Sequence, residues 1–247
     1  MTAFTHDSPR GRMAFGLLLA GVSALSFGMS GSIGKGLMEL GWTPGSATLA
    51  RVTIAALVLV VPGVRALRGD WSLVRKGWGS IVAYGVFAMG AAQLFYFIAV
   101  SHMDVSVALL IEYMSPLVVV LWLWKTRGQR PKAVTVGGAV LAMAGLVMLL
   151  GLLGGAQMSL VGVAWALGAM VGATVYWIIS ADDSSGLPPM SLAAGGLIVA
   201  TVLLAIAAAV GLLPLGFATG DVQYQGFSVP WWAALLVLGA VTAALAF

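Results

Sequence analysis

The chain has 247 residues, of which 61% are hydrophobic and only 8% charged, and its mean hydropathy is +1.05. A water-soluble domain could not cover its surface with so few polar side chains, so the composition excludes a soluble globular protein. The net charge of +4 comes without a basic stripe of interleaved aromatics, which excludes nucleic acid as a partner. The absence of cysteine excludes disulfides and metal–thiolate sites.

Eight apolar stretches fill the chain, each close to the ~20 residues that cross ~30 Å of hydrocarbon as a helix. In chain order they are Met13–Ile33, Ser46–Val64, Trp78–Val100, Val105–Trp124, Val134–Leu153, Leu160–Ser180, Met190–Leu213 and Pro230–Phe247. A barrel strand would be about half as long and would alternate polar with apolar residues. The sequence therefore predicts an all-α, polytopic transmembrane helical bundle embedded in a lipid bilayer.

The basic residues predict the orientation of these helices. Ten of the twelve lie before the first span, between the second and third, or between the fourth and fifth, which are all on one side if the helices alternate. Only Lys35 and Arg51 lie toward the opposite side. Because basic loops stay in the cytoplasm, we expect the N-terminus, Arg65–Lys76 and Lys125–Lys132 on the cytoplasmic side of the cell membrane. The connections after the sixth and seventh spans hold no Lys or Arg and give no signal.

An internal repeat relates the third span to the eighth. Trp78–Val86 (WGSIVAYGV) is echoed by Trp232–Ala240 (WAALLVLGA), with Trp and Gly in register, and Thr48–Ala50 in the second span resembles Ser191–Ala193 in the seventh. The repeat unit is then five helices. Because five is odd, the second copy starts from the other side of the membrane, which is typical of secondary transporters. Chance similarity between apolar segments is the alternative interpretation.

Several short motifs of the first repeat resemble one known family. They are Tyr84-Gly85 followed by Gln93, Tyr96 and Ala99; the run Ser106–Leu117; Gly128; and Gly137–Leu141 with Gly145. This set is similar to EamA-type permeases of the drug/metabolite transporter superfamily. The resemblance implies ten helices in two inverted five-helix repeats, no ATPase, and export or exchange of small metabolites such as amino acids or drugs through a central cavity. Gln129 departs from the pattern, since family members commonly have an acidic residue after the glycine.

The resemblance also divides the chain into two domains. Residues 1–153 correspond to a first EamA-like repeat and residues 154–247 to three helices of an incomplete second one. We therefore expect the chain to need further helices, from a longer protein or a partner, before it can transport. Its oligomeric state is left open, a homodimer being one option.

Buried charge identifies the first candidate site residues. Glu112 lies about 10 Å along the fourth span and Arg51 about 8 Å along the second, measured from the same side by the helical rise. An ionised side chain at such a depth costs about 2.5–3.5 kcal/mol on insertion scales, so it is retained for function by default. Pro116 removes the N–H that would bond the Glu112 carbonyl. We expect Glu112 to contact the substrate or a coupling ion, with Arg51 as its partner; a purely structural staple is the alternative.

Other polar residues are predicted to line the path. Gln93 and Tyr96 share one face of the third span, Tyr113 follows Glu112, and Ser30 lies in the first span. Each could instead be a helix-packing contact, which is the commoner role for such residues in membranes.

An intramembrane serine protease is the competing function. The sequence Gly28-Met29-Ser30-Gly31 matches the GxSG of rhomboid-type enzymes, whose serine needs a histidine base. His6 lies in the polar N-terminal tail and His102 in a loop, so this alternative is disfavoured. The chain also has no HExxH and no phosphate-binding GKS or GKT sequence. We therefore expect no enzyme, cofactor or metal, but a secondary transporter that moves a small-molecule substrate by alternating access.

Overall fold

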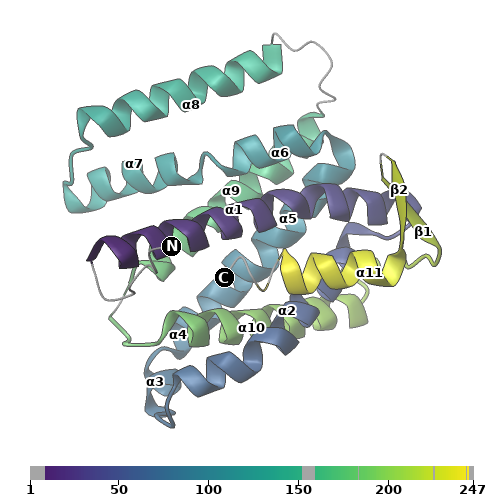
Figure 1. The fold of residues 1–247 in the computed structure, drawn as a ribbon, viewed down its shortest axis with the longest axis horizontal. Helices are drawn as coiled ribbons and strands as arrows, with labels where there is room; N and C mark the ends of the chain where they lie inside the picture. The colour runs from purple at the N-terminus through teal and green to yellow at the C-terminus, as the bar shows by residue number, and fades with distance from the viewer. Residues whose placement is uncertain (1–8, 152–158, 183, 225, 243, 245–247) are drawn as a thin grey trace, which may run out of the picture.

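The computed structural model describes residues 9–151, 159–182, 184–224, 226–242 and 244. These residues form a helical bundle with one short hairpin (Figure 1). The elements in chain order are α1 (Pro9–Leu40), α2 (Pro44–Ala66), α3 (Ser72–Lys76), α4 (Trp78–Ala83), η1 (Tyr84–Ala91), α5 (Ala92–His102), α6 (Val105–Glu112), α7 (Ser115–Arg127), α8 (Ala133–Gly151), α9 (Leu160–Ser180), α10 (Pro189–Ala209), β1 (Asp221–Tyr224), β2 (Phe227–Pro230), α11 (Trp231–Leu236) and η2 (Val237–Val241). The segments η1 and η2 are π-helical.

Described helices lie at all eight predicted spans. Five described stretches are long and apolar enough to cross a membrane: Pro44–Ala66, Trp78–His102, Val105–Arg127, Leu160–Ser180 and Pro189–Ala209. Ala133–Gly145 and Trp231–Val241 are shorter apolar helices at the places of the fifth and eighth predicted spans. The first predicted span lies within α1. The prediction of a polytopic helical bundle is therefore confirmed, while residues 152, 153, 243 and 245–247 of the predicted spans lie outside the described residues.

Local sequence sets the boundary between α1 and α2. Helix α1 continues to Leu40, beyond the expected end at Ile33, and stops where Gly41 has a φ of 119°, which a side chain would disfavour. Thr43 then caps α2, its Oγ1 accepting a hydrogen bond from the Ser46 N–H at 3.2 Å, and Pro44 takes the first helical position.

Small residues let α2 and α10 pack closely. A Cβ added at Gly63 would lie 2.5 Å from the Ala194 Cβ, and the Ser191 Oγ donates to the Gly63 carbonyl at 2.8 Å. Association of membrane helices depends on such close packing, since lipid is as apolar as the helix surface. One cluster of buried side chains surrounds this contact, and a second one joins α5, α6, α9 and α11.

The two π-helical segments each begin a few residues after a tryptophan. Segment η1 begins six residues after Trp78 and η2 five residues after Trp232. Gly85 in η1 lies against α10, where an added Cβ would be 2.6 Å from the Val199 Cβ. Gly239 in η2 lies against α2, where an added Cβ would be 2.5 Å from the Ile54 Cβ. Each glycine thus admits a close neighbour from the other half of the chain.

A β-hairpin follows the seventh span, and the all-α prediction did not include it. β1 and β2 pair antiparallel, with Val222 opposite Val229, around a turn in which Gly226 has a φ of 95°. The buried Val222 packs against Gly36 of α1, and the Tyr224 hydroxyl donates to the Ile33 carbonyl at 3.3 Å. Partial burial raises the pKa of Tyr224, so the hydroxyl stays protonated and remains a donor. The hairpin covers one end of α1.

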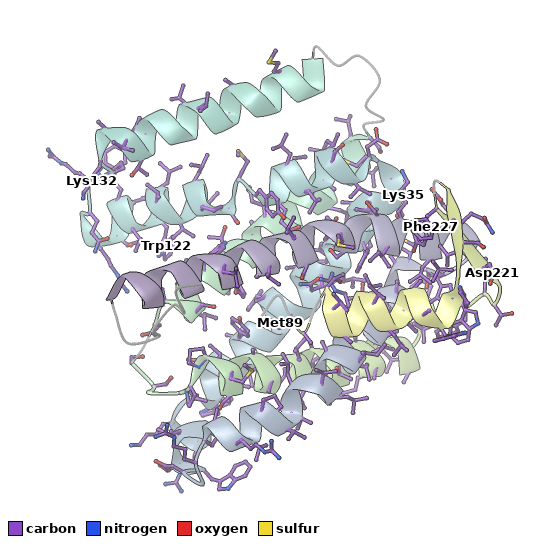
Figure 2. The ribbon with its side chains drawn as sticks, viewed as in Figure 1. Lys35, Met89, Trp122, Lys132, Asp221 and Phe227 are labelled. Atoms are coloured by element: carbon purple, nitrogen blue, oxygen red, sulfur yellow. The ribbon has the colours of Figure 1, made fainter. Side chains whose placement is uncertain are left out.

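Charged and aromatic side chains lie toward both ends of the bundle. Lys132 and the nearby Trp122 lie at one end, while Lys35 and the hairpin residues Asp221 and Phe227 lie at the other (Figure 2).

Helix α8 lies at the edge of the molecule beyond α6 and α7, with nearly all its described side chains exposed (Figure 1). Its apolar surface suits contact with lipid.

Candidate functional site

Two charged side chains are buried in the described part of the chain. Arg51 of α2 has an exposed fraction of 0% and Glu112 of α6 one of 5%. Gln93 and Tyr96 of α5 and Ser30 of α1 are also buried. The structure therefore gathers five of the six predicted site residues from four helices into the interior of the bundle.

Arg51 is held by several neutral groups. Its Nη1 donates to the Gln93 Oε1 at 2.6 Å, and its Nη2 donates to the Thr242 carbonyl at 3.3 Å. Its guanidinium carbon lies 5.5 Å from the centre of the Phe97 ring, within the range of a cation–π contact. Arg51 thus joins α2 to α5 and to the end of η2.

Glu112 lies where its transmembrane helix is interrupted. Helix α6 ends at Glu112, the Tyr113 N–H bonds the Leu109 carbonyl at 2.8 Å, and α7 begins at Ser115. Pro116 in the first turn of α7 has no N–H to continue the ladder, which is the physical reason for the break. The Glu112 Oε2 is buried and has no hydrogen-bond partner among the described residues. Broken helices of this kind form substrate and ion sites in transporters.

Two hydroxyl groups share this lack of partners. Tyr96 is 1% exposed and Ser30 0%, yet neither hydroxyl oxygen makes a hydrogen bond of acceptable geometry within the described structure. The two side chains are close neighbours, because a Cβ added at Gly31 would collide with the Tyr96 hydroxyl. Tyr96 also interacts electrostatically with Glu112. Buried polar atoms without a partner are rare in folded proteins and call for a ligand, water or ion.

The expected contact between Arg51 and Glu112 is not a direct one. No ion pair joins them within 4.0 Å; the pair of that length in the described structure is Lys35–Asp104, at 3.8 Å. The two charges still interact at longer range. The side chain that bonds the Arg51 guanidinium directly is Gln93, whose amide oxygen accepts a hydrogen bond from it.

The remaining predicted residue, Tyr113, lies at the edge of this region. Its side chain is 46% exposed, although it interacts electrostatically with Glu112. Sequence reasoning also missed two groups. Phe97 has a usable signal, since it is four residues after Gln93 and so shares its helix face. The Thr242 carbonyl has none, because any residue could supply a backbone oxygen.

The protease alternative finds no support in this geometry. No described histidine contacts Ser30: His102 is exposed at the end of α5, where its Nδ1 lies 2.8 Å from the Ile98 carbonyl. His6 lies outside the described residues. The same part of the chain also holds no group of three or more potential metal ligands.

Comparison with known proteins decides the family. Residues 14–151, more than half of the chain, match the EamA-like transporter family. The chain belongs to this family. EamA-like proteins are drug/metabolite transporters, so the chain is a multi-pass membrane protein of that class, as the motifs between Tyr84 and Gly145 suggest.

A solved structure supports the fold of this EamA-like chain. A crystal structure, described only as that of a protein, is similar with a TM-score of 0.63 over 93% of this chain and 75% of its own, at 24% identity. No curated protein matches the chain. At this identity the likeness to the crystal structure concerns the fold alone.

Proposed function

We propose that this EamA-like protein is a secondary transporter that moves a small organic substrate across the cell membrane, and that Glu112 contacts the substrate or its coupling ion. The observation that carries the proposal is the set of buried oxygen atoms without partners in Ser30, Tyr96 and Glu112. A helix that only needed to pack would avoid such groups, because each costs about 1–3 kcal/mol when it is left without a hydrogen bond. A transport site would gain that free energy back when its ligand arrives.

The movement that we propose is alternating access between two inverted repeats. The matching positions of η1 and η2, and the parallel roles of Gly85 and Gly239 against α10 and α2, support a relation between residues 1–153 and 154–247. In transporters of this kind one repeat rocks against the other around a fixed site. Arg51 lies on that boundary, because it bonds both α5 and the end of η2.

The test is transport by the protein in liposomes. A panel of radiolabelled amino acids, amines, sugars and cationic drugs is supplied to wild type, Glu112→Gln and the matched control Glu39→Gln, which changes an exposed acid of α1. We expect the wild type and Glu39→Gln to transport at least one solute. The transport rate of that solute should fall tenfold or more in Glu112→Gln, since a lost hydrogen bond to a charged group costs about 1.5–3 kcal/mol. Equal transport by all three proteins would remove Glu112 from the mechanism.

We further propose that the N-terminus and the loops around α3 and after α7 are cytoplasmic. Because the chain has no cysteine, a single cysteine can be introduced as a label site. Gln129→Cys follows α7 and Ser228→Cys lies in the hairpin, both at exposed positions. Glycines 69 and 128 are poorer choices because their φ values are positive. An impermeant maleimide added to intact cells is expected to label the Ser228→Cys protein but not the Gln129→Cys protein. The reverse pattern would invert the topology.

A further inference from the structure

The Glu112 region offers hydrogen-bond acceptors of a particular kind. The Glu112 Oε2, Ser30 Oγ and Tyr96 Oη come from three different helices, and all are buried without partners among the described residues. Each can accept a hydrogen bond, and the carboxylate can only accept when it is ionised. A primary ammonium group has three N–H donors and no acceptor, so it matches this set in number and in charge.

The helix break adds a second feature that favours a cation. Glu112 is the last residue of α6, and Pro116, four residues later, has no N–H to donate to the Glu112 carbonyl. The C-terminal end of a helix carries a partial negative charge. In membrane transporters, such ends of interrupted helices coordinate cations.

The buried arginine does not complete a site for an amino acid. A zwitterion would need a cationic group to receive its carboxylate, and Arg51 is the buried cation of the described structure. Its Nη1 and Nη2 already donate to Gln93 and the Thr242 carbonyl, and its face lies over Phe97. A substrate carboxylate near Glu112 would instead meet a like charge, which disfavours binding.

We infer that the substrate is an organic cation with a protonated primary amine and no carboxylate, and that its ammonium group is bound by Glu112, Tyr96 and Ser30. This inference rests on the proposed function and narrows the substrate class of the same site. The inferred site would bind an amine in preference to the amino acid that differs from it only by a carboxylate.

Matched pairs of ligands provide the test. The shift in Tm of the purified protein in detergent is titrated with phenethylamine against phenylalanine, and with isoamylamine against leucine. We expect each amine to bind about tenfold or more tightly than its amino acid, because the carboxylate is repelled and has no partner. The N,N,N-trimethyl derivative of phenethylamine keeps the charge but has no N–H donor. It is expected to bind about tenfold more weakly than phenethylamine.

Two sets of variants connect the binding to the proposed atoms. Glu112→Gln is expected to abolish the shift with amines, whereas Glu39→Gln is not. Tyr96→Phe and Ser30→Ala remove hydroxyls that lie near each other and make no close hydrogen bond to the rest of the described structure, so they are expected to keep the protein folded and weaken amine binding severalfold. Tyr224→Phe is the matched control, because its hydroxyl bonds Ile33 at the hairpin.

The outcomes separate this inference from the function on which it rests. Amine binding that depends on Glu112, Tyr96 and Ser30 supports the inference. Equal or tighter binding of the amino acids, still lost in Glu112→Gln, overturns the inference and leaves the proposed transport site in place. A transported solute whose binding is unchanged by Glu112→Gln overturns both.

Discussion

Two polar regions lie inside the bundle, and they differ in how well their groups are satisfied. Around Arg51, the guanidinium donates to Gln93 at 2.6 Å and to Thr242 at 3.3 Å and covers the ring of Phe97. Around Glu112, three oxygens on α1, α5 and α6 have no partner among the described residues. Burial is nearly complete in both regions, so the difference lies in the oxygen acceptors: those of Gln93 and Thr242 receive an N–H from Arg51, and the Glu112 Oε2 receives none from the described residues.

This difference separates a structural role from a binding role. A buried charge that donates to acceptors on two other segments holds those segments in place, and its removal leaves the acceptors without a donor. A buried acceptor without a donor destabilises the resting fold and is available to a ligand. We therefore expect mutations around Arg51 to act mainly on stability and mutations around Glu112 mainly on transport.

The largest effect on stability is expected from Arg51→Ala. The substitution leaves a cavity and deprives the Gln93 and Thr242 oxygens of their donor, so the free energy of unfolding should fall by about 3 kcal/mol or more. Thermal unfolding in detergent measures it. Arg75→Ala, at an exposed position in α3, is the control and should change little. If both variants were equally stable, Arg51 would not be a structural anchor.

A second effect should come from the glycine that places η2 beside Arg51. In Gly239→Ala the new methyl group would be 2.5 Å from the Ile54 Cβ, so η2 must move away from α2 and take the Thr242 carbonyl with it. Overpacking of this kind costs about 1–3 kcal/mol. The same unfolding measurement tests it.

Gly79→Ala is the matched control for this prediction, because a Cβ at Gly79 meets nothing within 4 Å. In a helix an exposed Gly→Ala change is expected to stabilise slightly, by up to about 1 kcal/mol. A Gly239→Ala protein as stable as the control would mean that α2 and η2 are not held this closely.

The third prediction concerns the coupling between the two regions. Because no ion pair joins Arg51 to Glu112 within 4.0 Å, a double-mutant cycle of Arg51→Gln and Glu112→Gln should give a coupling free energy below about 1 kcal/mol. Removing one member of a direct buried pair would cost about 3–5 kcal/mol. A coupling of that size would show that the two charges meet in the membrane.

The sequence was sufficient to predict much of the fold because the membrane imposes a simple rule. A stretch of about 20 apolar residues must form a helix, since lipid offers no hydrogen bonds to the backbone. The hairpin escaped this reasoning because it lies in a connection, where only the alternation of Val222 and Tyr224 and the turn glycine Gly226 indicate it. The π-helical segments have no comparable sequence signal.

The site could be predicted as a set of residues but not as a set of contacts. The cost of burying charge identifies Arg51 and Glu112 from sequence. Equal depth suggested that they pair, but depth along a helix does not specify which face meets which neighbour. Gln93 reaches the guanidinium, and the Thr242 carbonyl completes its contacts from a distant part of the sequence. Long-range contacts of this kind depend on the packing of the whole bundle.

The smallest effect on stability, and the sharpest test of the comparison, is expected from the two hydroxyls near Glu112. Tyr96→Phe and Ser30→Ala each delete an oxygen that makes no close hydrogen bond to the described residues and lies near only the other hydroxyl, so the free energy of unfolding should change by less than about 0.5 kcal/mol or should rise. Transport should nevertheless fall several-fold in each. Gln93→Leu is the contrasting variant: it removes an oxygen that Arg51 needs and should destabilise by about 1–3 kcal/mol.

The pattern across these variants decides between binding and packing, because the two roles predict opposite orders. If Ser30 and Tyr96 only packed α1 against α5, their variants would lose stability and transport together. If they bind the substrate, the variants stay as stable as the wild type, and the loss of transport appears in the KM or the kcat of a folded protein. A stable protein with impaired transport in both variants, beside an unstable Gln93→Leu, is the result that places the substrate on the Glu112 side.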